Sequence, residues 1–426
     1  MTWATHSSHA FRVNYYFVSA IPWLSLCSNH GLALVNAFGV DARRVLETYS
    51  AHKENPKIAR FVRGNQVARN NSLHSGKGEL CMTVKLKKLS DQVMVITGAS
   101  SGIGLVTARM AAKRGTRLIL NARNEEVLRR VCDEINHSGG EAYPVAGDVG
   151  QLEDVQRLAD EAIRRFGGFD TWVNNAGVSI YGPVLEQSLE DQRRLFETNY
   201  WGVVHGSRVA CAHLRNRGGA LINIGSVLSD IAIPIQGTYC ATKHAVKGYT
   251  DALRLELEAE GSPMWVTLIK PSAIDTPYTQ HAKNLMPSEP MNPAPVYAPE
   301  TVAEAILHCA EHPERDVYVG GAGMMLAEAG HHLPRLTDKL MESRMIDQQK
   351  SDRSKPPNRQ DSLHAPSVDG EERGRYPGHV AESSVYTKAS VHPLITGSVI
   401  AGLGIAAFAA WRFYDHKGNG RSSNYA

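Results

Sequence analysis

Residues 93–104 read VMVITGASSGIG, and this stretch decides the fold. The apolar run Val93–Ile96 has the length of a buried strand, and three glycines follow it between Thr97 and Gly104. Glycines in a turn between a strand and a helix let backbone amides approach a pyrophosphate, and the helix N-terminus adds a favourable dipole. A glycine-rich turn alone is weak evidence, and its place after a strand gives it meaning. The stretch predicts the first strand–turn–helix unit of a dinucleotide-binding sheet.

From Gln92 to about Gly320, short apolar runs alternate with longer amphipathic ones. A typical amphipathic run is Leu152–Phe166, with apolar residues at three- and four-residue spacing. Strands that alternate with helices imply right-handed crossovers and a parallel sheet covered on both faces. We therefore expect an α/β fold with a doubly wound Rossmann-type parallel sheet of about seven strands. The strand-like runs are Val93–Ile96, Arg117–Leu120, Ala142–Val145, Thr171–Val173, Ala220–Ile224, Trp265–Ile269 and Val317–Val319.

Further motifs follow the expected strands in order. They are Asp148-Val149 after the third strand, Asn174-Asn175-Ala176-Gly177 after the fourth, Asn199 within ETNYWG, Ser226 after the fifth, and Tyr239-Cys-Ala-Thr-Lys243. Together with the TGxxxGxG pattern of residues 97–104, they resemble the short-chain dehydrogenase/reductase family. The resemblance covers about residues 88–320, over half of the chain. Six motifs in the right order and spacing are specific to that family.

The resemblance implies a catalytic set of Asn199, Ser226, Tyr239 and Lys243 that exchanges a proton with an alcohol or a carbonyl. Tyr239 and Lys243 are four residues apart, so on a helix they share one face. A phenol has a pKa of about 10, and a neighbouring ammonium is expected to lower the pKa of Tyr239 toward the working range. By resemblance, Ser226 bonds the substrate oxygen and Asn199 holds a water that connects Lys243 to solvent. Each residue alone has an ordinary structural interpretation, and only the combination favours catalysis.

The end of the second expected strand bears on the choice of cofactor. Family members that prefer NAD(H) place an acidic residue there, whereas this chain has Ala122 followed by Arg123. A guanidinium suits a 2′-phosphate, so we expect NADP(H) rather than NAD(H). The resemblance implies these cofactor-binding residues: Gly98, Ser100, Ser101, Gly102, Ile103, Gly104, Arg123, Asp148, Val149, Asn175, Ala176, Gly177, Tyr239, Lys243, Ile274 and Thr276.

One motif departs from the family pattern. The family has a Pro-Gly pair after the sixth strand, and this chain has Pro271-Ser272 there. We expect Ser272 to alter the backbone turn beside the nicotinamide. Ile274 and Thr276 still stand where family members contact the nicotinamide carboxamide.

The substrate region is apolar in sequence. Leu228, Ile231, Ile233 and Pro234 lie between Ser226 and Tyr239, and residues 278–297 are expected to form a mobile lid. Such a wall favours a lipophilic small molecule such as a sterol, a retinoid or a fatty carbonyl, although these residues also suit an ordinary core. Two other functions stay open: a cofactor-binding scaffold or sensor with little turnover, and an epimerase or dehydratase on the same fold.

The rest of the chain divides by composition. Residues 1–81 are expected to be a poorly ordered extension or to precede the true start at Met82, 82–330 to form the catalytic domain, and 331–390 to be a polar linker. Residues 394–411 carry no charge and would span about 27 Å as a helix, so 391–412 is predicted to cross a membrane, followed by a polar tail over 413–426.

Charge and cysteine content exclude some partners and give a location. A net charge of +3, with basic residues spread along the chain, argues against nucleic acid as the main partner. The six cysteines are scattered without CxxC pairs, which favours free thiols and no metal site. The predicted span implies a single-pass membrane protein. Free thiols and the use of NADP(H) favour a catalytic domain on the cytoplasmic side. By resemblance, helices over 191–217 and 239–260 would mediate a homo-oligomer.

Overall fold

The structure is a computed structural model, and it describes residues 84–366 and 370–391. All of these residues belong to one compact unit, which begins at Met82. The predictions for residues 1–81 and for the tail 413–426 fall outside the described residues. The predicted membrane span also falls outside them except for its first residue, Val391, which ends a short helix.

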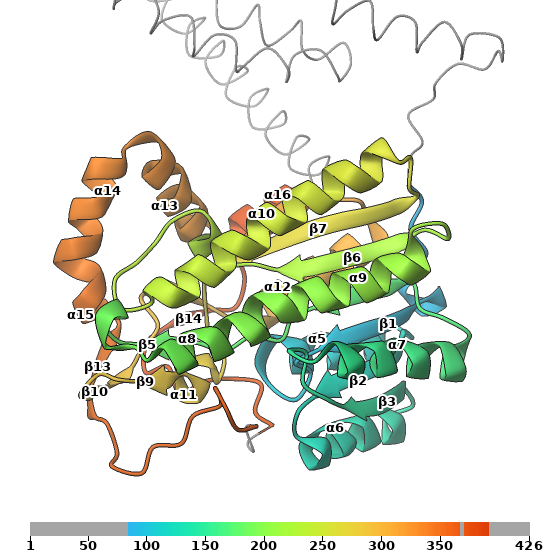
Figure 1. Cartoon of the computed structure of the whole chain (residues 1–426), viewed down its shortest axis with the longest axis horizontal. Coiled ribbons are helices and arrows are strands. Elements are labelled where there is room, and N and C mark those ends of the chain that lie inside the picture. Colours follow the sequence, from blue (N-terminus) through green and yellow to red (C-terminus); the bar gives the residue numbers. More distant parts are fainter. Residues whose placement is uncertain (1–83, 367–369, 392–426) are drawn as a thin grey trace, which may run out of the picture. The chain divides into compact units, whose positions relative to one another are not determined.

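The central sheet has seven parallel strands in the order β12-β7-β6-β4-β1-β2-β3, as Figure 1 shows in part. Each of the seven apolar runs forms one of these strands, so the predicted Rossmann-type sheet is confirmed. Chain order reverses between β1 and β4, which lie side by side with Val95 opposite Trp172. The strands are β1 (Val93–Thr97), β2 (Arg117–Ala122), β3 (Glu141–Ala146), β4 (Thr171–Asn174), β6 (Gly219–Ile224), β7 (Met264–Pro271) and β12 (Asp316–Val319).

Helices cover both faces of the sheet because successive strand residues point to opposite faces. Met94 and Ile96 pack with α5 (Gly102–Lys113), α6 (Glu125–His137) and α12 (Pro299–Glu311). Val93 and Val95 pack with α7 (Leu152–Phe166), α9 (Gly202–Leu214) and α10 (Gly237–Ala259). All five residues of β1 are buried, as expected for a strand covered on two sides.

Shorter elements surround the carboxyl ends of the strands. The helix expected over 191–217 is α8 (Leu189–Phe196) continuing into α9 through a π-helical turn at Glu197–Trp201. The segment expected as a lid begins with α11 (Tyr278–His281) and has its own backbone pairing. The short strands here are β5 (Ile180–Tyr181), β8 (Ala273–Ile274), β9 (Lys283–Asn284), β10 (Ser288–Pro290) and β11 (Val296–Tyr297).

The segment expected to be a polar linker differs from that prediction wherever the structure describes it. Residues 350–354 pair with β10, and residues 380–381 pair with β11. Gln349 and Leu363 are fully buried. A polar segment buries too little apolar surface to offset the entropy lost on ordering. Here the backbone pairing and the two buried side chains provide the missing stabilisation. The elements are α13 (Gly321–His332), α14 (Pro334–Leu340), a π-helical turn (Met341–Met345), α15 (Ile346–Gln348), β13 (Lys350–Ser354), β14 (Val380–Ala381) and α16 (Val385–Val391).

Among the described helices, none combines the length and the apolar content that crossing a bilayer would require.

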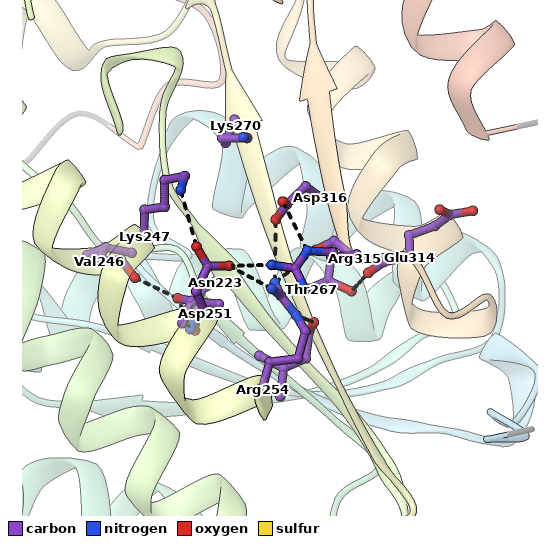
Figure 2. Close-up of polar contacts among 12 residues, drawn as sticks. Asn223, Val246, Lys247, Asp251, Arg254, Thr267, Lys270, Glu314, Arg315 and Asp316 are labelled. Carbon is purple, nitrogen blue, oxygen red and sulfur yellow. Dashed lines mark hydrogen bonds and ion pairs between the residues drawn. The ribbon is translucent and has the colours of Figure 1, made fainter. Parts of the chain in front are cut away.

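A buried charge cluster joins α10 to the edge of the sheet (Figure 2). The Arg254 side chain is only 3% exposed, and its guanidinium bonds Asp251 at 2.7 Å and Asp316 at 3.4 Å. It also donates to the backbone carbonyls of Val266 and Arg315. A charge removed from water needs this number of partners, so Arg254 ties the helix to β7 and to the start of β12.

We predict that Arg254→Ala lowers the free energy of unfolding by about 3 kcal/mol, because it removes a buried guanidinium that bonds two carboxylates and two backbone carbonyls. The matched control is Arg315→Ala, which removes a half-exposed partner of Asp251 and should lower it by less than about 1 kcal/mol. Urea unfolding of the whole chain, followed by tryptophan fluorescence, to which buried Trp172 contributes, measures both. Equal losses in the two variants would contradict this account of the cluster.

Candidate active site

One cavity of about 330 Å³ lies at the carboxyl ends of the strands. This is the edge at which open α/β sheets bind ligands, next to the point where chain order reverses. Of the catalytic and cofactor-binding residues that the sequence predicted, Gly104 and Asn199 are absent from its lining. Those that line it are Gly98, Ser100, Ser101, Gly102, Ile103, Arg123, Asp148, Val149, Asn175, Ala176, Gly177, Ser226, Tyr239, Lys243, Ile274 and Thr276. Of the predicted substrate wall, Leu228 and Ile233 line the cavity, whereas Ile231 and Pro234 do not.

The glycine-rich turn packs tightly against the turn after β4. Gly98 has φ +67°, and a Cβ there would lie 2.7 Å from the Cα of Ala176. A Cβ on Gly104 would lie 2.2 Å from the carbonyl oxygen of Gly98, so Gly104 serves this packing rather than the cavity surface. The Asn175 amide donates to the carbonyls of Thr97 and Gly98 at 2.9 and 3.2 Å. These contacts hold the N-terminus of α5 at the cavity with room for a ligand to approach backbone amides.

Tyr239 lies in the first turns of α10 and is only 9% exposed. Burial raises the pKa of Tyr239 to about 12, although hydrogen bonding with Tyr278 and Ser226 acts to lower it. The sequence predicted a pKa lowered by the neighbouring ammonium. The shift runs the other way, because desolvation of the phenolate outweighs the favourable contacts.

Lys243 lies one turn further along α10 and is buried. Its ammonium donates to the carbonyl oxygen of Ile224 at 2.9 Å and lies 5.6 Å from the centre of the Tyr239 ring. Burial lowers the pKa of Lys243 to about 8. The two side chains therefore share one cavity, as their spacing predicted, but burial disfavours the charge on each.

Asn199 lies in the π-helical turn between α8 and α9 and is fully buried. Its Oδ1 accepts from the backbone N–H of Val178, and its Nδ2 donates to the carbonyl of Val178, both at 2.9 Å. Nδ2 also donates to Thr242, next to Lys243. Asn199 therefore fixes the chain after β4 relative to α10 from behind the cavity wall.

Ser226 lines the cavity and also caps a turn. Its hydroxyl accepts from the backbone N–H of Leu228 at 3.0 Å, and its own N–H donates to the Ser229 hydroxyl. The helical turn Val227–Ser229 that follows is held by this reciprocal capping. The catalytic interpretation of Ser226 and the structural one are compatible.

Arg123 stands directly after β2, at the corner of the cavity where the sequence predicted a phosphate contact. Its guanidinium donates to the backbone carbonyls of Ser362 and Leu363. Burial lowers the pKa of Arg123. Asp148 forms an ion pair with Arg194 of α8 and accepts from the N–H of Gly150.

The departure at Ser272 is absorbed locally. Its N–H donates to the carbonyl of Val319 at 2.9 Å, which extends the pairing of β7 with β12. Ile274 and Thr276 follow and line the cavity, as expected.

Sequence reasoning missed one aromatic residue at the centre of the site. The Tyr278 ring, at the start of α11, lies 5.5 Å from the Tyr239 ring in an edge-on arrangement. Its hydroxyl donates to Gln236 at 3.0 Å, and Gln236 in turn donates to Gln349. The signal in the sequence was its place at the first position of the expected lid. Its contact with Tyr239 depends on the tertiary fold.

Comparison with known proteins agrees with this site. Residues 92–286 match the sequence model of the short chain dehydrogenase family. The oxidoreductase YxnA of Bacillus subtilis (strain 168) is 48% identical over 323 residues, which cover 75% of this chain and 91% of YxnA.

Two solved structures share the fold. A short-chain dehydrogenase/reductase of Burkholderia phymatum, solved in complex with NAD, matches with 26% identity and a TM-score of 0.52, covering 65% of this chain and 100% of its own. A short-chain dehydrogenase of Burkholderia cenocepacia J2315, solved in complex with NADP, matches with 26% identity and a TM-score of 0.51, covering 60% and 99%.

The Rossmann-type sheet and the 48% sequence identity to an oxidoreductase together define the class of protein. The chain belongs to the short-chain dehydrogenase/reductase family of oxidoreductases. The family resemblance predicted from its motifs is confirmed.

We predict that Lys243→Met raises the melting temperature at pH 7 by about 3–6 °C, although it removes a site residue. Burial lowers the pKa of Lys243 from 10.5 to about 8. Below pH 8 the folded chain therefore holds a buried ammonium, whereas in the unfolded chain the same ammonium is hydrated, and this difference destabilises the fold. As pH rises from 8 toward 10.5, only the unfolded chain keeps that proton, and wild-type stability recovers. Thermal unfolding at pH 7 and pH 9.5 measures the effect, and the gain should shrink at the higher pH. A gain that is the same at both would contradict the buried-charge explanation.

Proposed function

We propose that this protein is an NADP(H)-dependent oxidoreductase that interconverts an alcohol and a carbonyl, with Tyr239 as the general acid and base. The observation that carries the proposal is one cavity lined by both the glycine-rich turn and the Ser226, Tyr239 and Lys243 side chains. A scaffold that only binds a cofactor has no need to combine Ser226, Tyr239 and Lys243 in that cavity.

The residues present fit a nicotinamide dinucleotide. The turn after β1 is closed to any side chain at Gly98, and the amides at the N-terminus of α5 border the cavity. When bound, the cofactor would supply a hydride to the carbonyl carbon or accept one from the alcohol carbon. Arg123 supports NADP(H) over NAD(H), because its guanidinium lines the cavity and Ala122 stands at the position where NAD-preferring family members have a carboxylate.

The protein groups supply the proton. In the reducing direction, Tyr239 gives its hydroxyl proton to the carbonyl oxygen, and Ser226 orients that oxygen by a hydrogen bond. A pKa of about 12 keeps Tyr239 protonated at neutral pH, which suits a general acid. Lys243, with Asn199 and a bound water, would return the proton from solvent.

The substrate we propose is lipophilic. Leu228, Ile233, Leu326 and Met345 line the cavity and belong to, or pack against, the apolar cluster that contains Tyr239. A cavity wall of this kind favours an apolar carbonyl such as a sterol, a retinoid or a fatty aldehyde. Membrane attachment through residues 391–412, a cytoplasmic catalytic domain and a homo-oligomer stay predictions from the sequence.

We predict that Tyr239→Phe lowers kcat/KM for NADPH-dependent carbonyl reduction by about 10²- to 10⁴-fold, because phenylalanine has no proton to give. The assay is NADPH oxidation by the whole chain against aliphatic, aromatic and steroid-like carbonyls. The control is Tyr249→Phe, a half-buried tyrosine of the same helix, which should keep its activity within about twofold. NADPH binding without turnover on any carbonyl would instead favour the scaffold function.

We predict that Arg123→Ala lowers the preference for NADPH over NADH by about 10- to 100-fold, because a charge-assisted hydrogen bond to the 2′-phosphate is lost. The dissociation constants of both cofactors, measured by fluorescence titration, give the ratio. Arg114→Ala, on an exposed arginine near the amino end of β2, is the control. An unchanged ratio would remove Arg123 from cofactor selection.

A further inference from the structure

A polar segment of the chain lies across the cavity that we assign to the cofactor. We call its described residues, 356–366 and 370–376, the strap. Its first anchor is Arg359, whose side chain is 9% exposed and bonds Glu289 at 2.9 Å. The same guanidinium donates to the backbone carbonyls of Thr279, Gln280 and Ala282. Arg359 therefore fixes the strap to the segment that follows Tyr278.

The strap then contacts both sides of the cavity. On one side, the carbonyls of Ser362 and Leu363 accept from Arg123, after β2. On the other side, the Leu363 carbonyl accepts from Arg194 at 3.1 Å, and the His364 ring lies 2.8 Å from the Asp191 carboxylate. Both partners belong to α8. Ser362 and Pro366 line the cavity between them.

The second part of the strap reaches the N-terminus of α5. The carbonyl of Glu371 accepts from the backbone N–H of Gly102 at 2.9 Å. Glu372 pairs with Arg109 of the same helix at 2.7 Å. Gly374 then passes so close to Thr276 that a Cβ there would lie 2.5 Å from the Thr276 carbonyl oxygen.

The groups held by the strap are donors that suit phosphate. Arg123 is the expected contact of the 2′-phosphate, and Gly102 opens the helix whose N-terminal amides attract a pyrophosphate. The strap offers carbonyl oxygens to Arg123 and to the N–H of Gly102. These oxygens accept the hydrogen bonds that the phosphate oxygens of a cofactor would accept. Glu371 and Glu372 also bring negative charge to the helix N-terminus, where it opposes an incoming anion.

We infer that the strap is an autoinhibitory contact that competes with NADP(H) for Arg123 and Gly102 and is displaced when the cofactor binds. The inference rests on the proposed function, because it requires a phosphate-bearing cofactor in this cavity. A segment built to cover a bound cofactor would present donors to it, whereas the strap presents acceptors to the donors that the cofactor needs.

The test loosens the strap without substituting any of the proposed cofactor-binding residues. In the whole chain, Arg359→Ala removes the first anchor and His364→Ala removes the tie to α8. Each variant should lower the NADPH dissociation constant, measured by isothermal titration calorimetry, by about 3- to 10-fold. Gly374→Ala, which pushes the strap away from Thr276 without removing a charge, should act in the same direction. The control is His379→Ala, an exposed histidine beyond the strap, which should bind NADPH like the wild type.

A second measurement follows the strap itself. The Ser362 N–H donates to the carbonyl of His281 at 2.7 Å, so its hydrogen exchange should accelerate when saturating NADPH displaces the strap. NADPH binding that is unchanged or weaker in the loosened variants, or slower exchange at Ser362, would overturn the inference while leaving the proposed function standing. No NADPH binding by any of these proteins would instead overturn the proposed function and the inference together.

Discussion

The close approach of the turn after β1 to the turn after β4 is the constraint on which the rest of the site depends. Gly98 meets Ala176 with no space for a side chain, and the Asn175 amide bonds the carbonyls on either side of that contact. Because β1 and β4 are neighbours in the sheet, this packing fixes the position at which α5 begins. It also places Gly177 close to Asn199 and Lys243. The proposed cofactor-binding turn and the cavity wall that carries Lys243 are therefore positioned by the same contact.

Two titratable side chains that line the cavity, Tyr239 and Lys243, are buried away from water. Burial raises the pKa of Tyr239 and lowers that of Lys243, so each disfavours its own charge. A proton can leave Tyr239 only when something in the cavity compensates the buried phenolate.

The sequence was most informative where side-chain pattern and backbone structure coincide. Seven apolar runs became the seven strands, and motifs at their carboxyl ends converged on one cavity because parallel strands end at one edge. It was least informative over 331–391, where Leu363 and Glu371 act through backbone carbonyls that any residue carries. The Gln236–Gln349 bond and the pKa of Tyr239 likewise depend on tertiary neighbours that no local pattern encodes.

The place of the strap in the chain has a consequence for biosynthesis. Arg123 and its partner Leu363 are 240 residues apart, and every strand of the sheet precedes the strap. Translation proceeds from the N-terminus, so the Rossmann-type sheet leaves the ribosome first and can fold before the strap exists. During that interval the donors at Arg123 and Gly102 have no intramolecular acceptor from the strap. On the inference above, the cavity of the nascent domain is therefore open at first, and it is covered only after the strap has been translated.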